Sequence, residues 1–273
     1  MDMRGDRSTF QGKPTLSNIA SQACTADQFH ESDYIRLAAA ITQKPTFHRK
    51  QWEYIYILRA LEQLGLTTPG TTGLGFGCGR EPLTAVMAGH GLNLVITDIP
   101  PVGVVDPHWG SQSLMDSFYG GICPEDVYRR QVAFRAVDMN SIPDDLGLYD
   151  FLWSCCALEH LGSLQAGLDF IVKSTKCLKP GGFGIHTTEF NVSSDFDTLE
   201  SPGLSLYRRL DLIKLQDRLI EANCSMMPIN FYAGDLPEDL HIDLPPYAQT
   251  VHLKLQIGKY VVTSFGLVLR KNP

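Results

Sequence analysis

The chain has 273 residues, of which 44% are hydrophobic, and its formal net charge is −7 at pH 7. That length is sufficient for one large α/β domain with additional segments. The negative charge and the short, scattered basic clusters argue against nucleic acid as a partner, because such surfaces need gathered Lys and Arg. No segment reaches the roughly 18 apolar residues that cross a bilayer, so we expect no membrane insertion.

The seven cysteines indicate a reducing compartment. They are odd in number, several lie in apolar segments, and none shows the CxxC spacing of a metal site. This usage is typical of reduced, buried thiols. The first residues lack the apolar core of a signal peptide. We therefore expect a cytoplasmic protein.

The amino-terminal part of the chain predicts a polar arm that is mobile or loosely packed, followed by two helices. Residues 1 to about 25 show little periodicity, and the helices are expected over Glu31–Thr42 and Arg49–Leu64. The basic cluster at residues 48–50 is typical of a solvated face. Four side chains around the second helix either pack on the sheet or on a second subunit, or form part of a lid over a ligand: Phe47, His48, Trp52 and Tyr56.

A β-α-β unit follows and organises the rest of the chain. A strand over Gly73–Phe76 ends in the loop Gly75-Phe76-Gly77-Cys78-Gly79, a helix covers Glu81–His90, and a strand over Leu92–Thr97 stops at Asp98. Glycines at the first turn let the backbone approach a ligand closely, and an acid about 20 residues later can accept both hydroxyls of a ribose. The unit predicts an adenosine-type cofactor.

Strands and helices continue to alternate to the end of the chain. A Gly/Pro-rich stretch reaches about Gly110, an insertion is expected around residues 234–247, and the chain closes with a hairpin over Val251–Ile257 and Tyr260–Arg270. This alternation predicts an α/β fold with a doubly wound, mostly parallel sheet and an antiparallel last strand. The other expected strands are Val132–Val137, Tyr149–Cys156, Phe183–Thr188 and Asn223–Tyr232; the other helices are Ser111–Tyr119, Pro124–Gln131, Leu164–Cys177 and Tyr207–Ala222.

In such a sheet, ligands bind outside the carboxyl ends of the strands. The residues directly after each strand should therefore share one crevice. They are Gly77 to Glu81, Asp98, Asp138-Met139, Ser154 to His160, and His186 to Asn191.

These motifs, in this order, resemble those of class I S-adenosylmethionine-dependent methyltransferases. The resemblance rests on the glycine loop, Asp98, Asp138-Met139, Leu158-Glu159-His160-Leu161 and Leu178-Lys179-Pro180-Gly181-Gly182, and covers about residues 70 to 190. The segments GFGCGREPL, EHLGS, KPGGFGIHTTEFN and LPPY are similar to uncharacterised bacterial members linked to polysaccharide or natural-product pathways. The resemblance implies a Rossmann-like, seven-stranded sheet over residues 67–273, preceded by an amino-terminal arm and helical lid over residues 1–66.

The resemblance also implies which residues bind S-adenosyl-L-methionine. Gly75, Gly77 and Gly79 would face its methionine part, and Asp98 would bind the ribose. Around the adenine and the sulfonium would lie Asp138, Met139, Ser154 and Cys155.

Two positions of the loop depart from the family pattern. Gly75 stands where the family usually has an acid, and Glu81 stands where it usually has a glycine. Glu81 could bind the cofactor ammonium, or it could be a carboxylate favoured by the helix dipole.

Methyl transfer to a hydroxyl needs a base, and imidazole has a suitable pKa. The candidates for acid–base catalysis are Glu159, His160, His186 and Glu189. A divalent metal is the alternative, because Glu159, His160, Glu189 and His241 are ligand types that suit Mg²⁺ or Mn²⁺, and Glu-His at this place is similar to the metal-binding pair of small-RNA 2′-O-methyltransferases.

The sequence thus predicts an O-directed methyltransferase that acts on a small molecule or a sugar of a glycan precursor. A nicotinamide-dependent oxidoreductase is one rival, since a Gly-rich turn and a downstream acid suit that cofactor too. A non-catalytic protein that has kept the fold is another. A homo-oligomer is possible.

Overall fold

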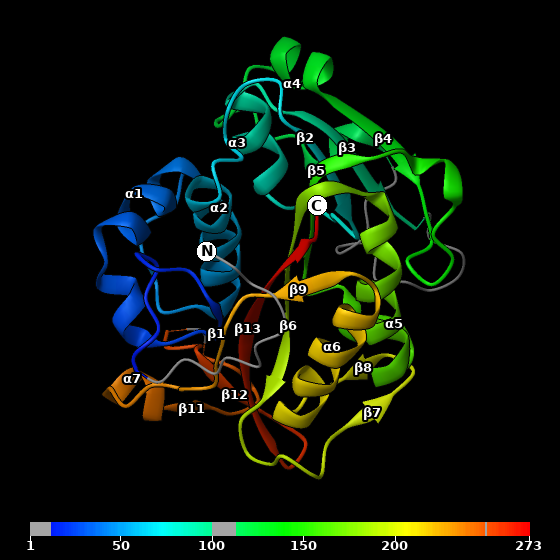
Figure 1. The fold of residues 1–273 in the computed structure, drawn as a ribbon. Coiled ribbons are helices and arrows are strands. Elements are labelled where there is room, and N and C mark those ends of the chain that lie inside the picture. Colours follow the sequence, from blue (N-terminus) through cyan, green and yellow to red (C-terminus); the bar gives the residue numbers. More distant parts are fainter. Residues whose placement is uncertain (1–11, 100–112, 249) are drawn as a thin grey trace.

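The computed structural model describes residues 12–99, 113–248 and 250–273 and shows a twisted central sheet between two layers of helices (Figure 1). Five parallel strands form its main part in the order β4-β3-β2-β5-β6, and β13 pairs antiparallel with β6. This confirms the predicted fold class. The strands are β2 (Thr72–Phe76), β3 (Asn93–Asp98), β4 (Val132–Ala136), β5 (Tyr149–Cys155), β6 (Leu178–Asn191) and β13 (Tyr260–Lys271).

The sheet is wider than the predicted seven strands, because short segments extend it beyond β13. In the described part of the chain it has 11 strands, and β7 (Glu200–Ser201) with β8 (Leu204–Ser205) forms a separate pair. The added strands are β1 (Ser21–Ala23), β9 (Cys224–Met226), β10 (Ile229–Asn230), β11 (Ile242–Asp243) and β12 (Lys254–Ile257). Of these segments, β9 and β10 lie within the expected strand Asn223–Tyr232 and β12 within Val251–Ile257, whereas β1 and β11, from the amino-terminal segment and the insertion, are too short to recognise from alternation.

Each face of the sheet is covered by its own helices and its own apolar core. Apolar side chains of α1 to α4 are buried on one face, and those of α5 and α6 on the other. The first group is α1 (Ser32–Ala40), α2 (Arg49–Gln63), α3 (Leu83–Gly89) and α4 (Glu125–Gln131); the second is α5 (Leu164–Ser174) and α6 (Arg209–Glu221), and α7 (Pro237–Leu240) belongs to the insertion. Single 3₁₀ turns cover residues 26–30, 114–117, 144–146, 158–160 and 175–177. No helix in residues 12–99, 113–248 and 250–273 is long and apolar enough to cross a membrane.

The segment before α1 is packed, not loose. Leu16 and Gln22 are fully buried, and β1 pairs with β13 through Gln22 and Ala23. The expectation of a loosely packed arm is therefore wrong for residues 12–25, because backbone pairing with β13 anchors a sequence that shows no periodicity. The predicted division between residues 1–66 and 67–273 stays a prediction. The Gly/Pro-rich stretch 100–110, the start of the expected helix at residue 111 and residues 1–11 lie outside the described residues.

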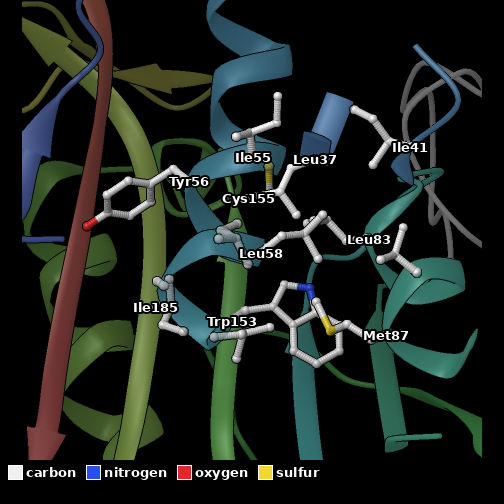
Figure 2. Close-up of a cluster of buried hydrophobic side chains, with 14 of the residues drawn as sticks. Leu37, Ile41, Ile55, Tyr56, Leu58, Leu83, Met87, Trp153, Cys155 and Ile185 are labelled. Carbon is white, nitrogen blue, oxygen red and sulfur yellow. The ribbon is translucent and has the colours of Figure 1, made fainter. Parts of the chain in front are cut away.

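Helix α2 is buried on more than one side, which decides the role of its aromatic residues. Trp52 and Tyr56 are fully buried and stacked, with ring centroids 4.9 Å apart. The Tyr56 hydroxyl donates a hydrogen bond to the Ala20 carbonyl oxygen at 2.6 Å. Figure 2 shows α2 side chains packed over Trp153 of β5 and Ile185 of β6. Trp52 and Tyr56 are thus core residues, and the lid hypothesis is wrong for them.

Candidate active site

The glycine loop after β2 lies at the carboxyl edge of the sheet beside the end of β3. Gly77 and Gly79 have φ values of 58° and 50°, in the left-handed region that favours glycine. The Gly79 N–H donates to Asp98 Oδ2 at 3.1 Å. The loop and the predicted ribose-binding carboxylate are therefore held together, as the cofactor hypothesis requires.

Gly75 explains the first departure from the family pattern. A Cβ atom at Gly75 would lie 2.3 Å from Cys78 Sγ and 2.4 Å from Cζ2 of the Trp153 ring. No side chain fits there without moving a large buried ring, so this position cannot supply the usual acid.

Glu81 explains the second departure, because it supplies a carboxylate next to the same loop. Its side chain is buried, with Oε1 3.4 Å from Lys50 Nζ. Its other oxygen, Oε2, is also buried and has no hydrogen-bond partner. Burial raises the pKa of Glu81 to about 7, although the nearby Lys50 ammonium works in the opposite direction. An unpartnered buried carboxylate oxygen fits a positively charged ligand group.

The first turn of α2 brings two cations to the site, and their counter-ion is Glu53. Lys50 Nζ lies 3.0 Å from Glu53 Oε2, and Arg49 Nη1 lies 3.4 Å from Glu53 Oε1. Burial alone would raise the pKa of the fully buried Glu53, but the attraction of Lys50 and Arg49 outweighs burial and lowers it to about 2. The expectation that residues 48–50 form a solvated face is therefore wrong. An acid three and four residues after two basic residues was the signal for this cluster.

A second group of acids lies at the ends of β5 and β6; we call Cys156, Glu159 and Glu189 the acid pocket. One ligand atom of each lies within 4.8 Å of the others. Glu189 Oε1 pairs with Arg49 Nη2 at 2.5 Å, and Glu159 Oε2 accepts a hydrogen bond from Thr188 Oγ1 at 3.2 Å. The second oxygen of each glutamate is buried and unpartnered.

Both glutamates of the acid pocket are shifted towards the protonated form. Burial raises the pKa of Glu189 to about 7, in spite of the Arg49 guanidinium. Burial likewise raises the pKa of Glu159, and the neighbouring His160 works against it. A carboxylate that titrates near neutrality suits proton transfer.

His186 and Ser154 do not reach this pocket. His186 is fully buried, its Nδ1 shares a 2.8 Å hydrogen bond with Ser154 Oγ, and its ring packs edge-on against Phe170 of α5. Burial lowers the pKa of His186 to about 3. Both side chains point into the core beneath α5, so the structure does not support the predicted roles of His186 in catalysis and of Ser154 in cofactor binding.

The other predicted site residues are spread along the same edge. Asp138 Oδ1 accepts a hydrogen bond from the Asn140 N–H at 2.8 Å, and Met139 lies under the loop, 3.1 Å from where a Cβ of Gly77 would be. Cys155 Sγ donates to Glu53 Oε2 at 3.4 Å. His160 Nδ1 donates to the Gly203 carbonyl oxygen at 2.7 Å.

The predicted metal ligands come together only in part. Glu159 and Glu189 meet, but the third member of their group is Cys156, and His160 and His241 are not in it. His241 is exposed in the insertion. The Arg49 guanidinium already supplies a positive charge to Glu189. Two carboxylates and a soft thiol with a resident cation fit Mg²⁺ poorly, since that ion prefers oxygen ligands.

No family model and no curated protein matches the sequence. Among solved structures, a provisionally assigned sarcosine dimethylglycine methyltransferase from Galdieria sulphuraria is similar at 14% identity, with a TM-score of 0.53 over 82% of this chain and 84% of that one. An S-adenosylmethionine-dependent methyltransferase from Mesorhizobium loti is similar at 11% identity, with a TM-score of 0.49 over 77% and 95% of the two chains. By the first of these likenesses and by its strand order, the chain has the Rossmann-like fold of the class I S-adenosylmethionine-dependent methyltransferases.

Proposed function

We propose that this protein transfers a methyl group from S-adenosylmethionine to a hydroxyl of a small molecule or of a sugar precursor. The observation that carries the proposal is a set of three buried carboxylate oxygens without partners, on Glu81, Glu159 and Glu189, at the ligand-binding edge of this fold. An unsatisfied buried acceptor is costly, and donors on bound ligands would satisfy it.

The cofactor would lie across the carboxyl ends of β2, β3 and β4. Asp98 would accept the ribose hydroxyls, Asp138 the adenine amino group, and Met139 would pack on the adenine ring. Glu81 would accept the α-ammonium. When bound, S-adenosylmethionine supplies a methyl group on a positively charged sulfur, which makes that carbon electrophilic.

The acid pocket would receive the acceptor hydroxyl. Glu189, whose pKa is about 7, would take the hydroxyl proton at neutral pH, and Glu159 would orient the hydroxyl through its unpartnered oxygen. Since displacement at a methyl carbon is in line, the main task of these side chains is alignment. The Nε2 atom of His160 is a second candidate proton acceptor.

The insertion would cover the acceptor from the side of α2. Asp243 of β11 accepts a hydrogen bond from His252 Nδ1 at 2.6 Å, and the His252 ring lies 4.7 Å from the His48 ring. The Arg49 N–H donates to the His252 carbonyl oxygen at 3.0 Å. These contacts hold the insertion next to Arg49, which pairs with Glu189 of the acid pocket. This position supports a role of the insertion in acceptor binding.

Calorimetry with S-adenosylhomocysteine and with NAD tests the proposal against its rivals. We expect S-adenosylhomocysteine to bind and NAD to show no heat of binding, because the loop lacks the GxxG continuation of dinucleotide sites. Binding of NAD alone would contradict the proposal. Binding of S-adenosylhomocysteine without turnover on any acceptor in a broad screen would favour a non-catalytic protein.

Metal-assisted methyl transfer is the second candidate function, favoured by the grouping of Cys156, Glu159 and Glu189. We expect turnover to be unchanged after exhaustive chelation, because Arg49 already neutralises Glu189. The measurement compares chelated protein with samples resupplied with Mg²⁺ or Mn²⁺. Loss of turnover on chelation, with recovery on resupply, would establish the metal-assisted reaction instead.

A further inference from the structure

We infer that Lys50 and Glu81 form a two-ended clamp for the amino-acid end of the cofactor, with Lys50 binding its carboxylate and Glu81 its ammonium. The inference rests on the proposed function and adds α2 to the cofactor site. It assigns a binding role to a lysine that precedes the first strand of the β-α-β unit.

Lys50 reaches from α2 to the point where β2 and β5 end side by side. Its Nζ lies 3.3 Å from the Cys155 carbonyl oxygen and 3.4 Å from Glu81 Oε1. Phe76, the last residue of β2, is paired with Ser154, the next-to-last residue of β5. The side chain of Lys50 is 27% exposed, so part of it lies at the surface of this edge.

Glu81 supplies the opposite charge beside Lys50. Its Oε1 faces Lys50, whereas its Oε2 is buried without a partner. Gly75 cannot carry a carboxylate, because the Trp153 ring and Cys78 fill the space where its side chain would be. Asp98 also contacts the glycine loop but is assigned to the ribose, which leaves Glu81 as the carboxylate beside the loop to receive an ammonium group.

The charge balance also favours a zwitterionic ligand group. The contact of Lys50 Nζ with Glu53 is 3.0 Å, whereas its 3.4 Å contact with Glu81 is longer than that of a good charged hydrogen bond. A zwitterion adds no net charge. Its carboxylate can accept a hydrogen bond from Lys50 Nζ, and its ammonium can donate to Glu81 Oε2, which would satisfy the unpartnered atom.

The test compares two probes that differ in the amino-acid end. S-adenosylhomocysteine has that end, and 5′-methylthioadenosine keeps the adenosine and the sulfur but lacks it. We expect Lys50→Met and Glu81→Gln each to raise the calorimetric Kd for S-adenosylhomocysteine by about ten- to a hundredfold, the range for losing a charge-assisted hydrogen bond. The Kd for 5′-methylthioadenosine should stay within about threefold. Lys44→Met, an exposed lysine just before α2, is the matched control and should change neither Kd.

Equal weakening of both probes, or of neither, would overturn the clamp. Lys50→Arg keeps the charge and should restore most of the affinity for S-adenosylhomocysteine, which separates a lost contact from a misfolded variant. If the unmodified protein binds neither probe, the proposed cofactor itself is wrong. If it binds both and the variants do not discriminate between them, the cofactor stands and only the clamp is wrong.

Discussion

Replacing Glu189 with Gln is expected to lower kcat by roughly 10²- to 10⁴-fold, the usual contribution of a positioned general base. Gln keeps the shape of the side chain but cannot take the acceptor proton. The Kd for S-adenosylhomocysteine should stay within a few-fold, since Glu189 lies at the end of β6 and not at the glycine loop. The measurement is turnover with a labelled methyl donor on the best acceptor from a screen of hydroxylated compounds.

The role of Glu189 as a base also predicts how the rate changes with pH. Because the pKa of Glu189 is raised to about 7, the rate of the unmodified protein should rise as the pH increases through 7 and the carboxyl loses its proton. The Glu189→Gln variant should lose that inflection. Glu200→Gln serves as the control, because this exposed carboxylate accepts a hydrogen bond from the Leu164 N–H and is not a member of the acid pocket. If the kcat of the Glu189→Gln variant stays within threefold of that of the unmodified protein, Glu189 is not the base.

Arg49→Met should lower the free energy of unfolding by about 3–5 kcal/mol at pH 7, the cost of leaving buried charges without their partner. Arg49 is 15% exposed and contacts Glu189 at 2.5 Å and Glu53 at 3.4 Å. Met retains much of the apolar volume, so the loss reports mainly on charge. Urea unfolding followed by circular dichroism measures it.

The loss from Arg49→Met should shrink as the pH falls from 7 towards 4.5. In the unmodified protein the pKa of Glu53 is lowered to about 2. The ion pairs of Glu53 therefore stabilise the fold fully at pH values above the ordinary pKa of a glutamate, and this stabilisation is lost as the pH falls towards 2. In the variant, Glu53 and Glu189 can take up protons at higher pH, which relieves the unpaired charge. Arg36→Met removes an exposed pair with Glu62 and should cost less than about 1 kcal/mol. Equal losses for both variants would contradict this account of Arg49.

The parallel sheet could be predicted because its signals are local. β2, β3 and β5 are mostly apolar, a glycine follows β2 and Asp98 ends β3, and the crevice follows from the common direction of the strands. The sequence pattern could also have separated His186 from Glu189. The two residues are three apart on one strand, and side chains of a strand alternate between faces, so only one of them could face the acid pocket.

The amino end of α2 could not be placed from the sequence. The sequence shows the apolar stripe by which this helix packs on the sheet. Tertiary packing, however, decides which strands have their carboxyl ends next to the first turn of the helix. Arg49, Lys50 and Glu53 reach the site because the buried face of α2 fits over Trp153 and Ile185 (Figure 2). The spacing of Glu53 after Arg49 and Lys50 indicates that these three residues pair with one another, but it does not indicate which part of the sheet they contact.

The pairing of β1 with β13 has a consequence for how the chain folds. Gln22 faces Gly266 in this pair, so a segment near one end of the described chain is held by the strand near the other end. Contacts between residues so far apart in sequence form late, because the chain between them must first be ordered. Until β13 is in place, one edge of β6 remains open to other chains. During synthesis, β1 would therefore pair only after β13 has been made. Until then, unfinished chains would associate first at the open edge of β6.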